Sequence, residues 1–321
     1  MDSSMHKSSR IYVAGHRGLV GSAICRRLCN DGYSNLLVRD RADLDLTNQS
    51  AVENFFAVEK PEYIFVAAAK VGGILANASY PVEFLRDNLA IELNVTEASY
   101  RHGVKKVQYL GSSCIYPRLA PQPIKEEYLL TGPLEPTNEW YAIAKIAGIK
   151  LAQAYRQQYG FQGISLMPTN LYGPEDNFDL QSSHVLPALM RKAHEAKIAG
   201  APEMVVWGSG APRREFMHVD DMADAAVFLM LHYDQAEIIN VGVGTDVSIR
   251  ELAELICRVV GYEGRLVFDT SKADGTPQKL LDVSRLRSLG WQARIGLEQG
   301  ITATYDWFLA RQRNPRRAAA R

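Results

Sequence analysis

The stretch Ile11-Tyr-Val-Ala14, followed at once by Gly15-His-Arg-Gly18-Leu-Val-Gly21, decides the fold of this chain. The short apolar run predicts a buried strand, and the periodic pattern after the last glycine predicts a helix. Glycines at this junction let the backbone turn tightly and approach a pyrophosphate at the helix N-terminus. The spacing differs from the G-x-G-x-x-G fingerprint, and a glycine-rich turn that serves packing alone is the alternative. Its place between strand and helix favours a phosphate-binding loop.

Further apolar runs alternate with amphipathic stretches along the first half of the chain. Strands are predicted over 36–38, 63–69, 107–110 and 163–167, and helices over 50–59, 88–102 and 141–159. Strands that alternate with helices of this length predict an α/β fold with a parallel sheet covered on both faces.

After Pro168 the loops lengthen and the elements become shorter. We predict helices over 184–197 and 249–260 and strands over 204–207 and 265–268. A nucleotide-binding domain then covers 10–170, and 215–245 returns to it with a helix over 219–231 and a strand over 238–241. A smaller substrate-binding domain comprises 171–214 and 246–310. Residues 1–9 and 311–321 are polar or basic and are predicted to be disordered tails.

The composition excludes several classes of protein. The 36 Lys and Arg residues balance the 36 Asp and Glu residues, which argues against non-specific nucleic-acid binding. The sequence has no apolar run of the roughly 18 residues that a membrane helix needs and no signal-peptide pattern. Four cysteines are too sparse for a disulfide framework, so we expect a cytoplasmic protein. Cys25 and Cys29 have no partner pair with zinc-like spacing, and no metal site is predicted.

The end of the second predicted strand decides between NAD and NADP. An acidic residue there accepts a hydrogen bond from the ribose 2′-hydroxyl of NAD, whereas arginine contacts the 2′-phosphate of NADP. Arg39 holds this position, with Asp40 and Arg41 after it, and Arg17 of the glycine loop can face the same pocket. Guanidinium groups bind phosphate with bidentate geometry, which favours NADP. A shift of one residue would make Asp40 the ribose acceptor and favour NAD.

A tyrosine and a lysine four residues apart form a candidate catalytic pair. Tyr141 and Lys145 share one face of the helix over 141–159. An ammonium group nearby lowers the pKa of a tyrosine toward the range of a proton donor to a carbonyl. This spacing alone is a common coincidence on helices. Ser112 and Ser113 follow the fourth predicted strand, at the carboxyl edge where such sheets bind ligands, and a hydroxyl there can hold the same carbonyl oxygen.

Ser112, Tyr141 and Lys145, together with the glycine loop, resemble the extended short-chain dehydrogenase/reductase family. Longer stretches resemble the GDP-L-fucose synthase group of that family, at 14–22, 67–73, 111–117, 135–138, 168–173, 206–210, 214–221 and 274–277. The resemblance runs from about Ile11 to Leu309. It implies a Rossmann-like, doubly wound parallel sheet with a smaller C-terminal α/β substrate domain.

The resemblance also implies an activity, a cofactor and an assembly. The expected reaction converts GDP-4-keto-6-deoxy-D-mannose to GDP-L-fucose by 3,5-epimerisation and then 4-keto reduction with NADPH, in a homodimer. Epimerisation needs a base and an acid on opposite faces of the sugar. By motif position Cys114 is the base and His184 the acid, since a thiolate and an imidazole both work near neutral pH. Without the resemblance, each would be read as a structural residue.

Binding residues are predicted from the same motifs. The NADP contacts are Gly15, His16, Arg17, Gly18, Leu19, Val20, Gly21, Arg39, Arg41, Leu110, Gly111, Ser112, Ser113, Lys145, Pro168, Thr169, Asn170, Leu171 and His184. The substrate contacts are Lys192 and Arg214 on the diphosphate, Trp207 on the nucleotide, and Asp274 on a sugar or ribose. A solvated Lys192 and a simple turn at Asp274 are the alternatives.

Three rival functions remain at this point. One is a nucleotide-sugar 4-epimerase with tightly held NAD, which Arg39 and the Cys114/His184 pair oppose. A 4,6-dehydratase needs an acidic pair where this chain has Ser113 and Cys114. A catalytically dead NADP sensor is the third. One departure from the family pattern is Asp179-Leu180, where we expect His-Pro, in the loop that leads to the retained His184.

Overall fold

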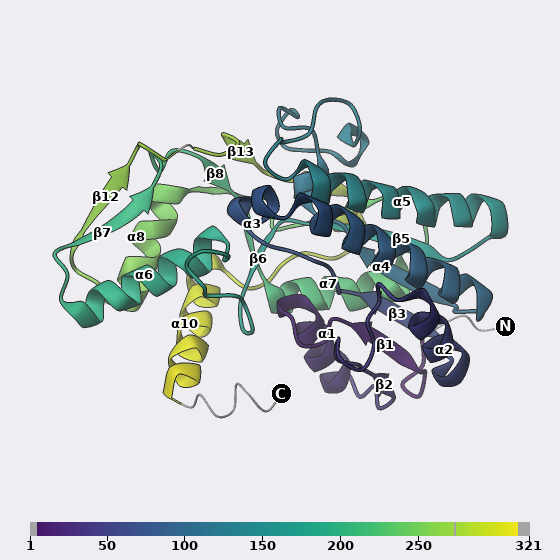
Figure 1. Ribbon diagram of the computed structural model, residues 1–321. Helices are drawn as coiled ribbons and strands as arrows, with labels where there is room; N and C mark the ends of the chain where they lie inside the picture. The colour runs from purple at the N-terminus through teal and green to yellow at the C-terminus, as the bar shows by residue number, and fades with distance from the viewer. Residues whose placement is uncertain (1–4, 273, 314–321) are drawn as a thin grey trace.

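The computed structural model describes residues 5–272 and 274–313 and has a six-stranded parallel sheet at its centre (Figure 1). The strand order is β10-β5-β4-β3-β1-β2. All five neighbouring pairs are parallel. The strands are β1 (Ile11–Ala14), β2 (Leu36–Leu37), β3 (Tyr63–Val66), β4 (Lys106–Leu110), β5 (Gly163–Pro168) and β10 (Ile239–Val241). The predicted α/β class with a doubly wound parallel sheet is confirmed.

Helices cover both faces of this sheet. One face carries α1 (Leu19–Asn30) and α7 (Val219–His232), and the other carries α2 (Gln49–Glu59), α4 (Pro81–Arg101) and α5 (Glu139–Tyr159) (Figure 1). The side chains of β1 alternate accordingly. Ile11 and Val13 belong to the core under α1 and α7, while Tyr12 and Ala14 belong to the core under the other three helices. A strand buried on both faces reads as a continuous apolar run, which explains the signal in the sequence.

The segment between β3 and α4 differs from its prediction. The strand predicted over 63–69 ends at Val66, and a short helix, α3 (Ile74–Ser79), follows an extended loop. Helix α4 begins at Pro81 and not at residue 88, because Pro at the first helical turn needs no hydrogen bond from its nitrogen. The loop lies against the glycine turn: a Cβ on Gly15 would come within 2.8 Å of the Ala67 carbonyl oxygen. Loop 67–73 therefore borders the predicted nucleotide site.

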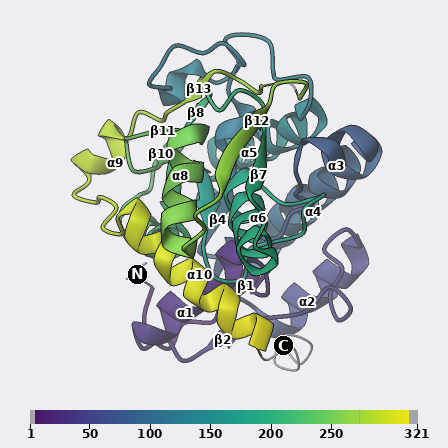
Figure 2. The same ribbon diagram turned by 90° about the vertical axis from the view of Figure 1, so that its left-hand side faces the viewer.

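A second lobe with its own core is built mainly from the later part of the chain, and Figure 2 brings it to the front. Two parallel strands, β7 (Glu203–Trp207) and β12 (Arg265–Asp269), pack with α6 (Val185–Ala199), α8 (Ile249–Val260) and α10 (Leu297–Arg313). A capping box of Ser248 and Glu251 starts α8.

Short strands join this lobe to the central sheet. β6 (Asn170–Tyr172) pairs with β9 (Phe216–His218), and β8 (Arg213–Arg214) lies between β11 (Val247–Ser248) and β13 (Gln278–Lys279). Small helices complete the described chain: η1 (Ser113–Ile115), η2 (Glu126–Tyr128) and α9 (Ser284–Ser288).

The prediction of disordered tails at residues 1–9 and 311–321 is partly wrong. Met5 is buried in the core under α1 and α7, and the Lys7 ammonium lies 3.9 Å from the centroid of the Tyr33 ring. Residues 5–9 are therefore attached to the folded chain, because one apolar side chain and one cation–π contact hold them there. At the other end α10 continues to Arg313. The rest of both predictions, 1–4 and 314–321, lies outside the described residues. In the part of the chain that the structure describes, no helix has the length and apolar character to cross a membrane.

Candidate active site

The turn between β1 and α1 has the shape that a bound phosphate needs. Gly15 has a φ of +80°, which favours glycine, and a Cβ on Gly21 would overlap the Gly15 carbonyl. No side chain caps the N-terminus of α1, so no side-chain oxygen occupies the N–H groups of its first turn. These groups carry partial positive charge and are free to bind an anion. The residues present therefore fit a dinucleotide pyrophosphate.

Two of the basic residues around this turn are held in partly exposed ion pairs. Arg17 lies 2.6 Å from an Asp40 carboxylate oxygen, and Arg39 pairs with Glu59. Arg41 is exposed. An exposed ion pair stabilises a protein by about 0.2–1 kcal/mol, so a bound phosphate can compete for either guanidinium. The structure thus places Arg17 of the loop beside Asp40 and gives Asp40 a partner other than a ribose.

The serine and the cysteine after β4 form one hydrogen-bonded turn. Ser112 is the N-cap of η1, and its hydroxyl accepts a hydrogen bond from the Cys114 N–H at 3.1 Å. Lys279 of β13 donates to the Cys114 sulfur at 3.6 Å. Burial raises the pKa of the thiol, but Lys279, Ser112 and Arg214 outweigh it and leave the pKa below its ordinary value. A thiolate is therefore stabilised at this position.

Lys279 is a candidate site residue that the sequence did not reveal. It lies two residues after the 274–277 motif, and β13 pairs with β8 so that Lys279 is opposite Arg214. The pairing brings two cations from distant parts of the chain toward one sulfur. The available signal was a lysine directly after a motif that already resembled a substrate-binding segment.

Tyr141 and Lys145 lie on the buried face of α5, as their spacing predicts. Burial raises the pKa of Tyr141, and Lys145 opposes that effect only in part. This differs from the expectation that the lysine lowers the tyrosine pKa, because desolvation is the larger effect. Lys145 donates to Glu92 of α4 at 2.7 Å, and both side chains are almost fully buried. Glu92 is a second residue that the sequence reasoning missed.

His184 is the N-cap residue of α6, at the edge of the other lobe. Its side chain is open to solvent, yet the protein around it reduces hydration of the charged ring and lowers its pKa. Among the described residues it shares no hydrogen bond or ion pair with Ser112, Cys114 or Tyr141. The loop before it reaches the first domain, since the Gly73 N–H donates to the Ser182 carbonyl at 3.2 Å.

The departure at Asp179 has a local structural explanation. Its carboxylate accepts hydrogen bonds at 3.0 Å from the backbone N–H groups of Gln181 and Ser182 and at 2.9 Å from the Ser182 hydroxyl. Asp179 therefore stabilises the turn that leads to His184, as an Asx turn does.

The predicted substrate residues gather on the second lobe. Trp207 is 60% exposed, and the ammonium groups of Lys192 and Lys272 lie 4.7 and 5.7 Å from its ring centroids. Lys272 was not predicted. Arg214 is largely buried near Cys114 and Asp274, which each raise its pKa against the larger effect of burial. Asp274 accepts from the Ser209 hydroxyl at 2.6 Å, so it fixes the loop beside Trp207.

The remaining predicted cofactor contacts line the carboxyl edge of the sheet. The Gly111 N–H donates to the Leu166 carbonyl at 2.8 Å, and Ser113 is buried. Thr169 and Asn170 both donate to the carbonyl of Glu215, at 3.2 and 2.8 Å. The buried Glu215 carboxylate accepts from the N–H groups of 243, 244 and 281, so it holds the loop after β10 and the segment after β13 against this edge.

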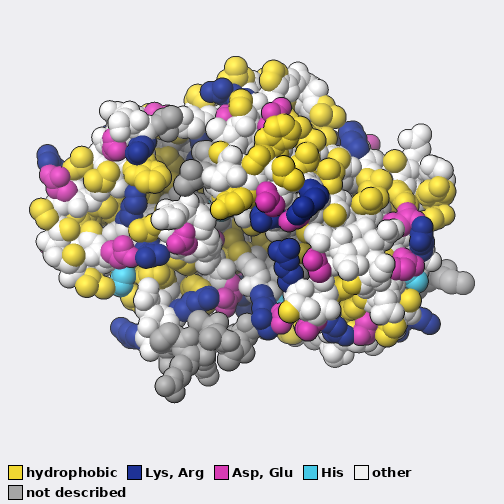
Figure 3. All heavy atoms as spheres, viewed as in Figure 1, with side chains coloured by type: hydrophobic (Ala, Val, Ile, Leu, Met, Phe, Trp, Pro, Cys, Tyr) yellow, Lys and Arg dark blue, Asp and Glu magenta, His cyan; other side chains and the backbone are white. Residues whose placement is uncertain are grey.

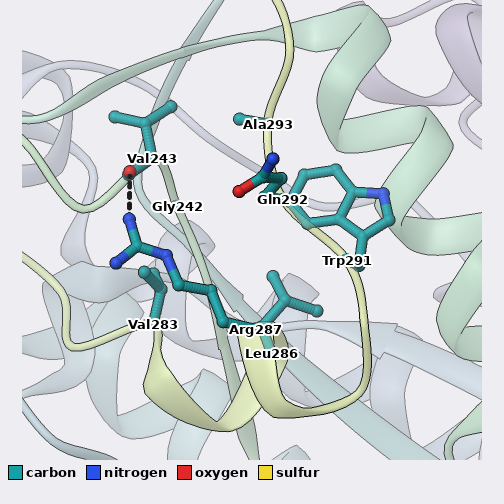
Figure 4. Close-up of a pocket in the computed structure, with 8 residues that line it drawn as sticks. All are labelled: Gly242, Val243, Val283, Leu286, Arg287, Trp291, Gln292 and Ala293. Atoms are coloured by element: carbon teal, nitrogen blue, oxygen red, sulfur yellow. Dashed lines mark hydrogen bonds between the residues drawn. The ribbon is translucent and has the colours of Figure 1, made fainter.

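The surface view shows where these two lobes meet. Figure 3 shows a hollow between the left-hand and right-hand lobes with several Lys and Arg side chains along it. A separate pocket in Figure 4 lies between Val243, Arg287 and Trp291 and contains none of the predicted catalytic residues. Arg287 closes part of it by donating to the Val243 carbonyl at 3.1 Å. Among the described residues, no group of three His, Cys, Asp or Glu side chains is placed to hold a metal ion.

A parallel sheet with a glycine turn, a Tyr–Lys pair on one helix face and a serine at the strand end is typical of enzymes that bind a nicotinamide dinucleotide. The chain belongs to the NAD dependent epimerase/dehydratase family, whose model matches residues 11–242.

Within this family, the chain is similar to known GDP-L-fucose synthases. The chain is 61% identical to GDP-L-fucose synthase 1 of Arabidopsis thaliana over 309 residues, which cover 96% of each chain. It is 55% identical to GDP-L-fucose synthase of Escherichia coli K12, over 94% of this chain and 97% of the other. A crystal structure of a GDP-L-fucose synthetase from Naegleria fowleri bound to NADP matches with a TM-score of 0.90 at 32% identity, covering 97% of both chains. The resemblance predicted from the sequence is confirmed.

Proposed function

We propose that this chain converts GDP-4-keto-6-deoxy-D-mannose to GDP-L-fucose, by epimerisation at C3 and C5 followed by reduction of the C4 ketone with NADPH. The observation that carries the proposal is the Cys114 thiol, which Lys279 faces while the Ser112 hydroxyl holds the Cys114 backbone, close to the Tyr141–Lys145 pair. A plain ketone reductase needs the tyrosine and lysine but has no use for a stabilised thiolate.

The glycine turn holds the cofactor in this proposal. Gly15, Gly18 and Gly21 admit the pyrophosphate at the start of α1, and Arg39 or Arg17 binds the 2′-phosphate. When bound, NADPH supplies the hydride that C4 accepts.

Cys114 and His184 move the protons of the epimerisation. The Cys114 thiolate removes the proton from a carbon next to the ketone, and the electron pair passes to the C4 oxygen. Ser112 and Tyr141 donate hydrogen bonds to that oxygen and stabilise its negative charge. His184 returns a proton to the carbon from the opposite face. In the reduction Tyr141 gives its phenolic proton to the C4 oxygen, and Lys145 stabilises the phenolate that remains.

The second lobe binds the GDP part of the substrate. Lys192, Lys272 and Arg214 supply positive charge for the diphosphate, and the exposed ring of Trp207 offers a stacking surface. Asp274 acts through the loop that it fixes. We accordingly keep the division into a cofactor domain, 10–170 with 215–245, and a substrate domain, 171–214 with 246–310.

We further propose a cytoplasmic homodimer that pairs α4 and α5 of two copies. Large apolar side chains on the outer faces of these helices are exposed, among them Leu93, Tyr100 and Tyr159. The rings of Tyr100 and Tyr159 stack with centroids 4.6 Å apart, so residues of α4 and α5 form one aromatic cluster. A contiguous exposed apolar surface of this kind is typical of a protein interface.

The function is tested with purified protein, the GDP-keto-sugar and NADPH. We expect stoichiometric loss of the reduced-nicotinamide absorbance and formation of GDP-L-fucose. Tyr141→Phe removes the proton donor and should slow reduction by about 10²–10⁴-fold, while NADPH still binds with near-normal affinity. A wild-type protein that leaves NADPH unoxidised would refute the proposed function, and unchanged turnover in the variant would refute the role of Tyr141.

A further inference from the structure

A buried carboxylate faces the catalytic lysine from a neighbouring helix. Glu92 is 3% exposed, and its Oε1 accepts a hydrogen bond from the Lys145 ammonium at 2.7 Å. Its second oxygen, Oε2, is buried and has no hydrogen-bond partner within the described part of the chain. A carboxylate with one oxygen unsatisfied is costly to bury unless it is needed there.

The surroundings fix the orientation of this side chain. A Cβ on Gly148 of α5 would lie 2.7 and 2.8 Å from Cγ and Cδ of Glu92, so only glycine leaves room for the carboxyl group. The close approach of α4 and α5 is therefore shaped around one carboxylate directed at Lys145.

We propose that Glu92 is a positioning residue, which holds Lys145 beside Tyr141 and keeps the lysine charged while the tyrosine acts as proton donor. This inference rests on the proposed function, because it concerns the same reduction step. It assigns Glu92 no contact with the substrate or the cofactor.

The charges around Tyr141 and Lys145 determine the direction in which removal of the Glu92 charge shifts their pKa values. Tyr141 is faced by Lys145 on its own helix, by Glu92 of α4 and by Cys114 of η1. Lys145 is faced by Glu92 and Tyr141, and the phenol of Tyr109 on β4 lies close enough to Glu92 to be affected by it. The negative charge of Glu92 raises the pKa of both Tyr141 and Lys145. Removing that charge makes either proton easier to lose.

The experiment is the pH profile of kcat for reduction of the GDP-keto-sugar with NADPH in Glu92→Gln. Reduction requires protonated Tyr141 and charged Lys145, so the alkaline limb should move to lower pH by about one unit, while the acidic plateau changes little. Glu92→Asp restores the charge and should return the limb toward its wild-type position. Glu97→Gln is the matched control, because Glu97 also joins α4 to α5, through Tyr155, but away from the lysine. It should leave the profile unchanged.

Two results would overturn the proposal: a wild-type profile in Glu92→Gln, or an equal shift in the Glu97 control. If Glu92→Gln does not fold, Gly148→Ala serves as the test variant, because its Cβ displaces the carboxyl group of Glu92. A smaller shift in the same direction is then expected, and no shift would refute the inference. Wild-type protein without any reduction would instead refute the proposed function, so the two failures are distinguishable.

Discussion

The cofactor turn and the catalytic turn both contain cations, but the two regions use charge differently. Arg17 and Arg39 lie in partly exposed pairs with Asp40 and Glu59. Lys145 lies in a pair whose members are 3% and 4% exposed. Water and salt screen the first kind of pair strongly and the second kind weakly.

This contrast separates binding from chemistry. An exposed pair of about 0.2–1 kcal/mol can rearrange when a phosphate arrives, so the arginines can select a cofactor without determining the structure. A broken buried pair leaves an uncompensated charge that costs about 3–5 kcal/mol, so its geometry stays fixed while protons move nearby. Substitutions in the buried region should therefore change proton transfer, and substitutions in the exposed region should change affinity and its salt dependence.

Cys114→Ser is expected to have the largest effect. A serine hydroxyl has a far higher pKa than a thiol, so the base is lost and proton exchange at C3 and C5 should fall by about 10²-fold or more. Solvent deuterium incorporation into those carbons measures the loss, and NADPH oxidation with an already epimerised keto-sugar measures reduction separately.

Cys25→Ser is the control for this variant. Burial raises the pKa of Cys25 to about 11, and it lies on α1 with no place in the proposed mechanism. It should retain normal exchange. Deuterium entry at the wild-type rate in Cys114→Ser would show that another group is the base.

Lys279→Met should have an intermediate effect that depends on pH. Removal of the ammonium group 3.6 Å from the sulfur raises the pKa of Cys114, so less thiolate is present at neutral pH. A rise of one pKa unit corresponds to about a tenfold loss of exchange. The loss should diminish as the pH rises, and a pH profile of deuterium incorporation measures it.

Lys272→Met provides the comparison for Lys279→Met. Lys272 also lies on the second lobe but faces the exposed ring of Trp207. We expect a higher KM for the substrate with an unchanged pH profile. A profile for Lys279→Met that matches the wild type would mean that Arg214 and Ser112 alone hold the thiolate.

The parts of this site that can be predicted are those whose residues lie close together in the sequence. The glycine turn and the Tyr141–Lys145 pair each lie within one turn or one helix, so spacing alone places their residues near one another. Lys279 reaches the same site because β13 pairs with β8, and Glu92 reaches it because α4 packs against α5. The spacing of residues in the sequence does not reveal such long-range contacts.

One signal for Glu92 was nevertheless present. It lies on α4 beside Ile91 and close to Val95 and Thr96, which all face the interior. A charged residue on the buried face of an amphipathic helix needs a partner, so its position predicts one even when the partner is unknown. The sign of the pKa shift at Tyr141 could not be obtained in the same way, because it depends on how deeply the ring is buried.

Arg39→Asp should have the smallest effect on the proton-transfer steps and tests the partly exposed region. If Arg39 leaves Glu59 to bind the 2′-phosphate, the substitution should weaken NADPH relative to NADH by about tenfold, because the charge beside the phosphate changes sign. The wild-type preference should also decrease as salt is added, whereas the alkaline limb set by the buried pair should not move. Arg17→Ala tests the second arginine, and its loss leaves Asp40, among the described residues, with His16 alone, at 3.4 Å. An unaltered preference in Arg39→Asp together with a reversed preference in Arg17→Ala would assign cofactor selection to the Arg17–Asp40 pair, and the contrast between exposed and buried charge would still hold.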